Sequence, residues 1–426
     1  MASKTNLSVV VDVGTSKLAA IAGWKNEDGK IEIAGMSKVP SRGIKRGTVM
    51  NIDEAADSVV QLLDELKQKT GSKISKVDIS YAGQPVKILE HRGYRYTSGG
   101  EVVTRKDVDE LLQEAGSIQI EQDYKILHVI PQSYVVDDEP ADFNPVGITG
   151  RKIEAIYKVI IVPEIHLINF RRVFDKAGVE LGNITLSPFA VSEAVLTRDE
   201  KEMGAICLDI GAGTTKLTVY HENAMIHLSI IPFGGQVITL DIKEGCCILP
   251  KWAEQLKIQY GQALGDFADE RKVVTIPGHS GWEPKEISFK SLSFIIQARL
   301  EEMIDQVFFY FEKSELAGQL GAGIVISGGT SGLNNLVSLV KFRTGMDARL
   351  AFPVIRPVNM TKDMDTTGYL TALGLLQLTL DKADPAAIKK SKPPRKKKES
   401  RFSPWLKGVV QGVLDYVDDD DDVALK

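Results

Sequence analysis

Apolar residues gather in short runs along the chain, and two pairs of these runs enclose the same kind of turn. The turn Asp12 to Lys17 lies between residues 7–11 and 18–23, and the turn Asp209 to Lys216 lies between two similar runs. Apolar and β-branched residues on both sides of a Gly-Thr turn predict a β-hairpin. A nucleotide-binding loop of the Walker type would need a helix directly after its glycines, so the pattern indicates two hairpins instead.

Both turns carry residues that can bind phosphate. Glycines let backbone N–H groups approach an anion, and polar side chains add further donors. These residues are Gly14, Thr15, Ser16 and Lys17 in the first turn, and Gly211, Gly213, Thr214 and Thr215 in the second. The acids that open the turns, Asp12 and Asp209, stand where a hydrated Mg²⁺ would bridge to the phosphates. A single turn of this kind is usually an ordinary tight hairpin, but the duplication favours two hairpins that grip one phosphate chain.

A third segment belongs with the two hairpins. Ile324 to Ser327 reads as a buried strand, Gly328-Gly329 as a turn, and the residues from near Leu333 as the start of a helix. A helix N-terminus behind a glycine turn presents N–H groups and the positive end of a dipole to an anion. The three segments, in this order, resemble the actin-like ATPase superfamily, which includes actin, the Hsp70 chaperones and the sugar kinases. The resemblance implies an α/β, ribonuclease H-like duplicated fold with two lobes around a cleft for ATP or ADP and Mg²⁺.

Other segments resemble one family within that superfamily, the FtsA family of bacterial cell-division actin homologues. They are Pro40 to Ile44, His128 to Tyr134, Asn144 to Gly147, and Leu264-Gly265 after Ile258 to Gly261, and the likeness runs collinearly from about Val9 to Leu376. The resemblance implies an inserted subdomain 1C at residues 85–163 and a subdomain 2B at residues 244–321. Subdomain 1A would comprise residues 1–84, 164–196 and 355–384, and subdomain 2A would comprise residues 197–243 and 322–354.

The resemblance also assigns roles to residues of the predicted 2B region. Glu254 and Lys257 lie three positions apart on a predicted helix, so they share one face. Such a pair is ordinarily a solvated ion pair, but in bacterial actins a Glu-x-x-Lys helix flanks the adenosine, which implies nucleotide contact here. FtsA captures the C-terminal peptide of the tubulin-like protein FtsZ on subdomain 2B, and Arg299 falls where a family arginine supports that contact. An arginine fork suits an acidic peptide, and an ordinary surface charge is an equal alternative.

The chain lacks the acid with which Hsp70-type relatives orient an attacking water. That acid directly precedes the proline of the segment corresponding to Leu186 to Ala190, and here the position is Ser187. Helical spacing turns the nearest carboxylate, Glu193, about half a turn away. No aspartate can be assigned to deprotonate the substrate of a small-molecule kinase, which is one alternative function. We therefore assign no catalytic residue and expect at most a weak ATPase, in which nucleotide acts as a conformational or polymerisation ligand.

Composition and charge narrow the class of partners. With 43% apolar and 26% charged residues among 426, the chain has the composition of a globular protein. Residues 389–426 carry ten Lys or Arg against seven Asp or Glu, so the remainder is strongly acidic and unsuited to non-specific binding of nucleic acid. The three cysteines suggest neither zinc nor a disulfide framework, and a reducing cytosol is the simplest environment. No apolar stretch predicts a membrane span, and the N-terminus leaves no room for a signal peptide.

The C-terminal region changes character after Asp384. Residues 385–402 are rich in Lys, Arg and Pro and cannot pack a core, so a disordered basic linker is expected. Residues 403–417 read as an amphipathic helix whose lipid-facing residues are Trp405, Leu406, Val409, Val410 and Val413. A basic run beside such a helix suits an anionic lipid surface. Residues 418–426 form an acidic tail that opposes this attraction, and the linker charge is expected to prevail.

The FtsA family anchors the division ring to the inner membrane with a helix in this place. The resemblance therefore implies an ATP-binding protein that forms filaments and tethers FtsZ to the cytoplasmic face of the inner membrane at the division septum. Other division proteins would be further partners. A pilus-assembly actin homologue shares the 1C arrangement and is the second alternative, although it engages a membrane-protein peptide instead of a lipid helix.

Overall fold

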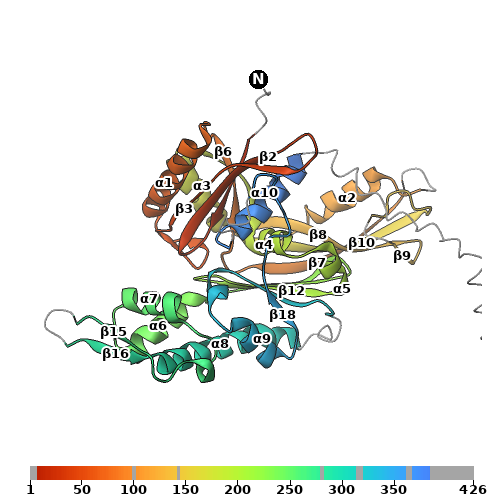
Figure 1. The fold of residues 1–426 in the computed structure, drawn as a ribbon. Coiled ribbons are helices and arrows are strands. Elements are labelled where there is room, and N and C mark those ends of the chain that lie inside the picture. The colour runs from red at the N-terminus through yellow and green to blue at the C-terminus, as the bar shows by residue number, and fades with distance from the viewer. Residues whose placement is uncertain are drawn as a thin grey trace, which may run out of the picture. The chain divides into compact units, whose positions relative to one another are not determined.

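The computed structural model describes residues 7–97, 102–141, 144–278, 283–312, 320–360 and 367–383 (Figure 1). Residues up to Leu380 belong to one compact unit. The predicted basic linker, amphipathic helix and acidic tail lie outside the described residues, as do Trp405, Leu406, Val409, Val410 and Val413. Within the described part of the chain, no helix combines the length and the apolar character needed to cross a bilayer.

The first half of the chain is built on a five-stranded sheet. Its strands lie in the order β11 (Glu180–Leu186), β6 (Lys76–Tyr81), β1 (Ser8–Val13), β2 (Lys17–Lys25) and β3 (Ile31–Pro40). β1, β2 and β3 form an antiparallel meander, whereas β6 runs parallel to β1 and β11 runs parallel to β6. The central strands β6, β1 and β2 are buried at most positions because helices cover both faces of the sheet.

Helix α1 (Ile52–Thr70) covers one face of this sheet beside α3 (Glu164–Lys176), as Figure 1 shows. The Asn51 side chain accepts hydrogen bonds from the first N–H groups of α1, and the helix ends at Gly71 in the left-handed conformation. Helices α4 (Ser187–Val195) and α10 (Leu370–Ala383) contribute to the core on the other face. The short strands β4 (Ile44–Lys45) and β5 (Thr48–Val49) form a separate pair.

The second half repeats the topology of the first. Its sheet has the order β14 (Ala224–Ile231), β13 (Thr215–His221), β12 (Ala205–Ile210), β17 (Gly323–Ser327) and β18 (Ala348–Leu350). β12, β13 and β14 form an antiparallel meander, and β17 and β18 continue the sheet in parallel. β12 therefore corresponds to β1, and β17 corresponds to β6. This repeat confirms the predicted duplicated α/β fold.

One helix of the second half precedes β12, and the others follow its antiparallel meander. They are α5 (Arg198–Met203), α6 (Gly235–Cys246), α7 (Pro250–Tyr260), α8 (Phe289–Glu312) and α9 (Leu336–Thr344), with a short hairpin of β15 (Val273–Ile276) and β16 (Lys285–Ser288) between α7 and α8. Ile206 and Leu208 of β12 pack in the core with α6, α8 and α9, whereas Cys207 between them packs in the core of the first half. The alternation of side chains along one strand thus joins the two halves.

An inserted unit between β6 and α3 forms its own antiparallel sheet. The strand order is β7 (Lys87–Tyr96), β10 (Lys152–Pro163), β8 (Tyr124–Val136) and β9 (Glu139–Ala141), and α2 (Arg105–Ala115) packs on it. His128 of β8 accepts a hydrogen bond from the N–H of Leu186 at 3.0 Å and meets the Phe189 ring edge-on, so it joins the inserted sheet to α4 and β11.

Candidate nucleotide-binding cleft

A cavity of about 850 Å³ lies where the two repeated halves meet. Both hairpin turns, the Gly-Gly turn after β17, and residues of α6 and α7 line it. The predicted site residues that line it are Asp12, Gly14, Thr15, Ser16, Lys17, Asp209, Gly211, Gly213, Thr214, Glu254, Lys257, Gly328 and Gly329. Thr215 does not line the cavity. Its hydroxyl donates to the Phe233 carbonyl oxygen at 2.9 Å inside the second half, so its assignment to the site is corrected.

The two hairpins close with the same backbone geometry. The N–H of Gly14 donates to the Lys17 carbonyl oxygen at 3.1 Å, and the N–H of Gly211 donates to the Thr214 carbonyl oxygen at 2.9 Å. Each turn therefore has the same length, although the motifs in the sequence end in Lys-Leu at different spacings. Lys17 corresponds to Thr214 in the structure and has no counterpart at Lys216.

Glycines bring the turns together where side chains would not fit. A Cβ added at Gly213 would lie 2.5 Å from Thr15 Oγ1 of the opposite hairpin. Gly328 has a φ of 91°, and a Cβ there would lie 2.3 Å from the carbonyl oxygen of Ile210. The backbone of the second half thus approaches the Thr15 side chain and the end of β12 more closely than a side chain would allow, which suits the cradle that a phosphate chain needs.

The helix predicted to open near Leu333 begins later. A 3₁₀ turn, η3 (Gly329–Gly332), follows the Gly-Gly turn, and α9 starts only at Leu336. The glycines prevent a regular helix from starting sooner, because they lower helical propensity and permit the tighter turn. η3 lines the cavity in place of the predicted helix N-terminus.

Helix α6 points its N-terminus at the cavity, which the sequence analysis missed. Its first two residues, Gly235 and Gln236, line the cavity. Their N–H groups donate to the carbonyl oxygens of Gly211 and Ala212 at 2.8 and 2.9 Å, so α6 fixes the second hairpin. The pair Gly234-Gly235 before a helical apolar pattern was the signal that could have revealed this helix start.

The Glu254–Lys257 pair on α7 forms as predicted. Lys257 Nζ lies 2.7 Å from Glu254 Oε2 and also donates to the Gly235 carbonyl oxygen and to Thr239 Oγ1, at 2.9 and 2.8 Å. The Thr239 hydroxyl in turn donates to Glu254 Oε2. Lys257 is buried, whereas Glu254 remains partly exposed at the cavity wall. The lysine therefore joins α7 to the first turn of α6 and holds the carboxylate toward the cavity.

The two aspartates have different partners. Asp12 Oδ1 accepts a hydrogen bond from Ser80 Oγ at 2.5 Å, and burial raises the pKa of Asp12 against the opposing effects of Lys216 and this bond. Asp209 Oδ2 lies 2.6 Å from Lys216 Nζ in a buried ion pair. Burial alone would lower the pKa of Lys216, but the charges of Asp209 and Asp12 outweigh it and raise that pKa. Lys216 was not singled out from the sequence, because only strand pairing places it opposite Asp209.

A divalent cation expected from the fold would depend on these carboxylates. Among the described residues no group of three or more His, Cys, Asp or Glu side chains could hold a metal ion directly. A cation would therefore bind through water beside Asp12 and Asp209, next to the Lys216 ammonium. Like charges repel at this range, so the donors present fit a fixed ammonium better than a bound dication.

Comparison with known proteins agrees with this architecture. The family profile "Cell division protein FtsA" matches residues 206–374, and the profile "SHS2 domain inserted in FTSA" matches residues 83–161. Cell division protein FtsA of Pseudomonas aeruginosa is 32% identical over 374 residues, covering 88% of this chain and 89% of the relative. FtsA of Neisseria meningitidis serogroup B is 33% identical, covering 86% and 88%. The chain belongs to the FtsA family of cell division proteins.

Solved structures of more distant proteins share the fold. A PilM–PilN type IV pilus biogenesis complex aligns with a TM-score of 0.62 at 16% identity, covering 88% of this chain and 98% of that one. MreB5 of Spiroplasma citri bound to ADP aligns with a TM-score of 0.56 at 15% identity, covering 89% and 99%. These likenesses confirm the actin-like fold of this FtsA-family chain, and the SHS2 match agrees with the inserted sheet described above.

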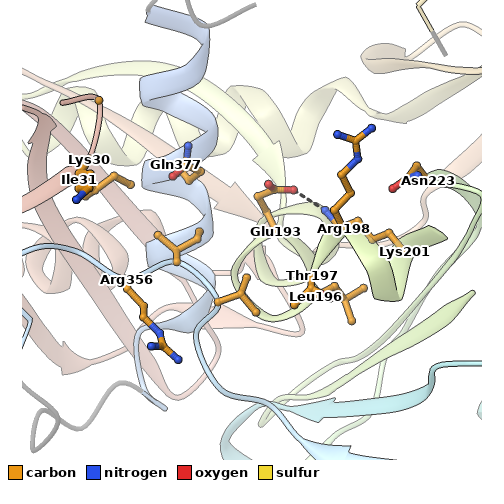
Figure 2. A pocket seen from close by; sticks show the side chains of 13 residues that line it. Lys30, Ile31, Glu193, Leu196, Thr197, Arg198, Lys201, Asn223, Arg356 and Gln377 are labelled. Atoms are coloured by element: carbon orange, nitrogen blue, oxygen red, sulfur yellow. Dashed lines mark hydrogen bonds and ion pairs between the residues drawn. The ribbon is translucent and has the colours of Figure 1, made fainter. Parts of the chain in front are cut away.

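Ser187 of this FtsA-family chain lies in the cleft, whereas Glu193 does not. Ser187 is 1% exposed and lines the cavity, and its Oγ is a buried atom without a hydrogen-bond partner in the described structure. Glu193 lies six positions later on α4, where its Oε2 accepts from Lys201 Nζ at 2.7 Å. The side chains of Glu193 and Lys201 line a second cavity of about 780 Å³, which shares no lining residue with the cleft (Figure 2). The carboxylate is thus directed away, as helical spacing predicted.

Arg299 lies on α8 and clamps two helices together. Its guanidinium donates to both oxygens of Asp241 on α6, one of them at 3.0 Å, and to Glu302 one turn along α8. The planar fork predicted to receive a peptide carboxylate is therefore occupied by a carboxylate of this chain. An acidic peptide that used Arg299 would have to compete with Asp241.

Proposed function

We propose that this FtsA-family chain binds ATP or ADP in the cleft between its two hairpins and acts as an actin-like scaffold in cell division. The observation that carries the proposal is the cradle itself. Two glycine turns from two halves meet at one cavity, and at Gly213 and Gly328 there is no room for side chains. The unpartnered Ser187 hydroxyl adds a buried donor that a ligand or its water could satisfy.

The nucleotide's parts have distinct places in this proposal. Gly14, Thr15, Ser16 and Lys17 and the opposing Gly211, Gly213 and Thr214 bind the phosphates, with backbone N–H groups as the main donors. Glu254, held by Lys257, faces the ribose, and Gly328-Gly329 lies against the opposite side of the adenosine. The sequence also predicts Mg²⁺ beside Asp12 and Asp209. The Lys216 ammonium opposes that prediction, because its positive charge is already paired with Asp209.

Hydrolysis is proposed to be slow. A hydroxyl at Ser187 is a poor base, and the carboxylate of Glu193 is paired with Lys201 in the other cavity. Turnover should therefore lie well below about 1 s⁻¹, the low end of typical enzymes. Bound nucleotide then serves to select a conformation or to support filament formation.

The tethering role rests on the family resemblance and on the chain beyond Asp384. We propose that the chain captures the C-terminal peptide of FtsZ on the region around α8 and binds anionic lipid through residues 403–417. Its place would be the cytoplasmic face of the inner membrane at the septum, with itself and other division proteins as partners. The basic linker supplies electrostatic attraction, and Trp405 with its apolar neighbours supplies burial.

Equilibrium binding of ATP to the full chain tests the central claim. Gly213→Val should abolish binding because the new side chain would occupy the space of Thr15. Gly116→Ala is the matched control, since a Cβ there meets its nearest neighbour at 3.5 Å in the inserted unit, and it should bind as the parent does. Unchanged affinity in Gly213→Val would remove the cleft assignment.

Two further measurements test the scaffold role. A synthetic C-terminal FtsZ peptide should capture the chain, and Arg299→Ala should show whether the α8 region takes part. Full-length protein should sediment with anionic liposomes, less so at high salt, and truncation after Asp384 should release it while ATP binding persists. Failure of the peptide to capture the chain would favour the pilus-type scaffold, since the chain shares its fold with the PilM–PilN complex.

A further inference from the structure

The second hairpin carries a fixed positive charge at the cleft that the first hairpin lacks. Asp209 pairs across the strands with Lys216, and the corresponding pair in the first hairpin is Asp12 with Ala19. Lys216 Nζ lies 2.6 Å from Asp209 Oδ2, and the two residues are only 8% and 3% exposed. The ammonium is therefore an internal part of the site and not a mobile surface charge.

The Lys216 ammonium lies beside the glycine turn and interacts with both aspartates. A Cβ built on Gly211 would lie 3.7 Å from Lys216 Nζ, so the charge sits against the wall of the phosphate cradle. Asp12 from the opposite half also acts on Lys216 electrostatically. One cation thus lies within reach of the two carboxylates that a hydrated Mg²⁺ would use.

A divalent cation at a phosphate site has two electrostatic tasks, which are to screen nearby carboxylates from the phosphates and to attract the polyphosphate. An ammonium with three N–H donors can do both when it is already paired with the carboxylate. A dication placed beside it would gain less from Asp209, whose charge the lysine already balances, and it would meet a like charge.

We propose that the Lys216 ammonium takes the place of the divalent cation in this cleft, so that the chain binds the polyphosphate of a nucleoside di- or triphosphate without a metal. This inference rests on the proposed nucleotide function of the same cavity. It changes the prediction for Asp209, which becomes the residue that holds the lysine and not a contact of a hydrated metal.

The test compares ATP binding to the full chain in EDTA and in excess Mg²⁺ by isothermal titration. We expect the two dissociation constants to agree within about threefold, a difference below the tenfold that 1.4 kcal/mol represents. Binding that weakens tenfold or more in EDTA overturns the role of Lys216 but leaves the nucleotide site in place. No binding in either condition overturns the proposed nucleotide function itself, so the two failures are distinct.

Variants make the assignment specific to this lysine. Lys216→Met should weaken binding in EDTA by about tenfold or more and restore a response to Mg²⁺, because Asp209 then lacks its cation. Lys257→Met is the matched control, since its ammonium contacts Glu254, Thr239 and Gly235, and it should lower affinity equally with and without Mg²⁺. Lys216→Met that binds in EDTA like the parent would show that the lysine is only structural.

A stability check accompanies the variants, because Lys216→Met leaves Asp209 buried without a partner. If that protein does not fold, the double variant Asp209→Asn/Lys216→Met removes both charges together. It should bind ATP with no more response to Mg²⁺ than the parent, since the Asp209 carboxylate that would need a cation is removed together with its ammonium and only Asp12 remains. A Mg²⁺ requirement in the double variant would overturn the proposal, because the cation would then act elsewhere.

Discussion

In the first half of the molecule, Asp12 lies opposite Ala19 and accepts a hydrogen bond from Ser80. In the second half, the corresponding Asp209 lies opposite Lys216 and forms an ion pair with it. The strand order, the turn length and the closing hydrogen bond of the two hairpins are the same. The same backbone thus holds its two aspartates in different electrostatic environments, because a neutral hydroxyl donates to Asp12 whereas a charged ammonium pairs with Asp209.

The serine that holds Asp12 also has a counterpart. Parallel pairing places Ser327 of β17 beside Asp209, and Ser80 of β6 lies beside Asp12, to which it donates a hydrogen bond. The next residue is Gly328 in the second half and Tyr81 in the first. The glycine lets the backbone approach Ile210 at the cavity, whereas the tyrosine is fully buried in the core and donates to or accepts from His166. Equivalent positions therefore serve the ligand cavity in one half and packing in the other.

The insertions differ as well. The first half is interrupted between β6 and α3 by a four-stranded sheet with its own core. The second half is extended between α6 and β17 by helices and one short hairpin, which share the core of their half. Residues of α7 reach the cavity from this extension, while the inserted sheet contributes none of its strands to the cavity wall. The two additions thus have unequal parts in the proposed binding site.

The largest expected effect breaks the ion pair that distinguishes the halves. Lys216→Ala should lower the free energy of unfolding by about 3–5 kcal/mol, because it leaves a buried carboxylate without its cation. Lys17→Ala in the first hairpin removes a half-buried lysine and should cost less than about 1 kcal/mol. Urea unfolding of both variants measures the difference, and equal losses would show that Lys216 is not a special partner of Asp209.

A second variant tests Gly328, which follows Ser327 at the position that Tyr81 occupies after Ser80 in the first half. Gly328→Ala should lower the free energy of unfolding by about 2–5 kcal/mol, through strain at a positive φ and contact with the Ile210 carbonyl. Gly329→Ala has no atom within 4 Å of the new Cβ and should change stability by less than about 0.5 kcal/mol. Thermal unfolding midpoints of the Gly328→Ala and Gly329→Ala variants measure the difference. Similar midpoints for the two variants would contradict the proposed backbone constraint at Gly328.

The two serines should also differ in importance. Ser80→Ala removes a donor to Asp12 and an acceptor for the N–H of Val13, so we expect a loss of about 1–2 kcal/mol. Ser327→Ala should lose less, because the carboxylate beside it is already held by Lys216. Chemical unfolding at neutral pH measures both, and a larger loss for Ser327→Ala would reverse the comparison.

The smallest effect should come from Asp12, and its sign should be opposite to that of Asp209. Burial raises the pKa of Asp12, so the folded state takes up a proton more readily than the unfolded state. Its charged form therefore opposes folding above the raised pKa, and Asp12→Asn should stabilise slightly at neutral pH. This gain should shrink as the pH falls and the parent carboxyl becomes protonated. Asp209→Asn should instead destabilise at neutral pH, and by more, because it leaves the buried Lys216 ammonium without its carboxylate. Unfolding curves of both variants at neutral and acidic pH measure the two changes, and a change of the same sign in both would contradict the comparison.

Local patterns in the sequence were sufficient for the repeated elements. Apolar runs around two Gly-Thr turns predicted both hairpins, because strand alternation and turn chemistry depend on neighbouring residues. The spacing of Glu254 and Lys257 predicted their ion pair for the same reason, since one helical turn brings them together. Helical spacing also placed Glu193 away from the cleft, and the resemblance to a known family supplied the duplicated fold.

Only the tertiary structure decided which of these residues share the cavity and with what charge. Strand register directs the Thr215 side chain away from the cavity, toward the Phe233 carbonyl oxygen, and places Lys216 opposite Asp209. Thr215 and Lys216 are nevertheless neighbours in the same sequence motif. Packing of α8 on α6 gave Arg299 an internal carboxylate at Asp241, 58 positions away. Contacts of this kind depend on how whole helices and strands pack, and that packing cannot be predicted from the spacing of residues along the chain. The charge of the cleft is therefore a property of the assembled fold.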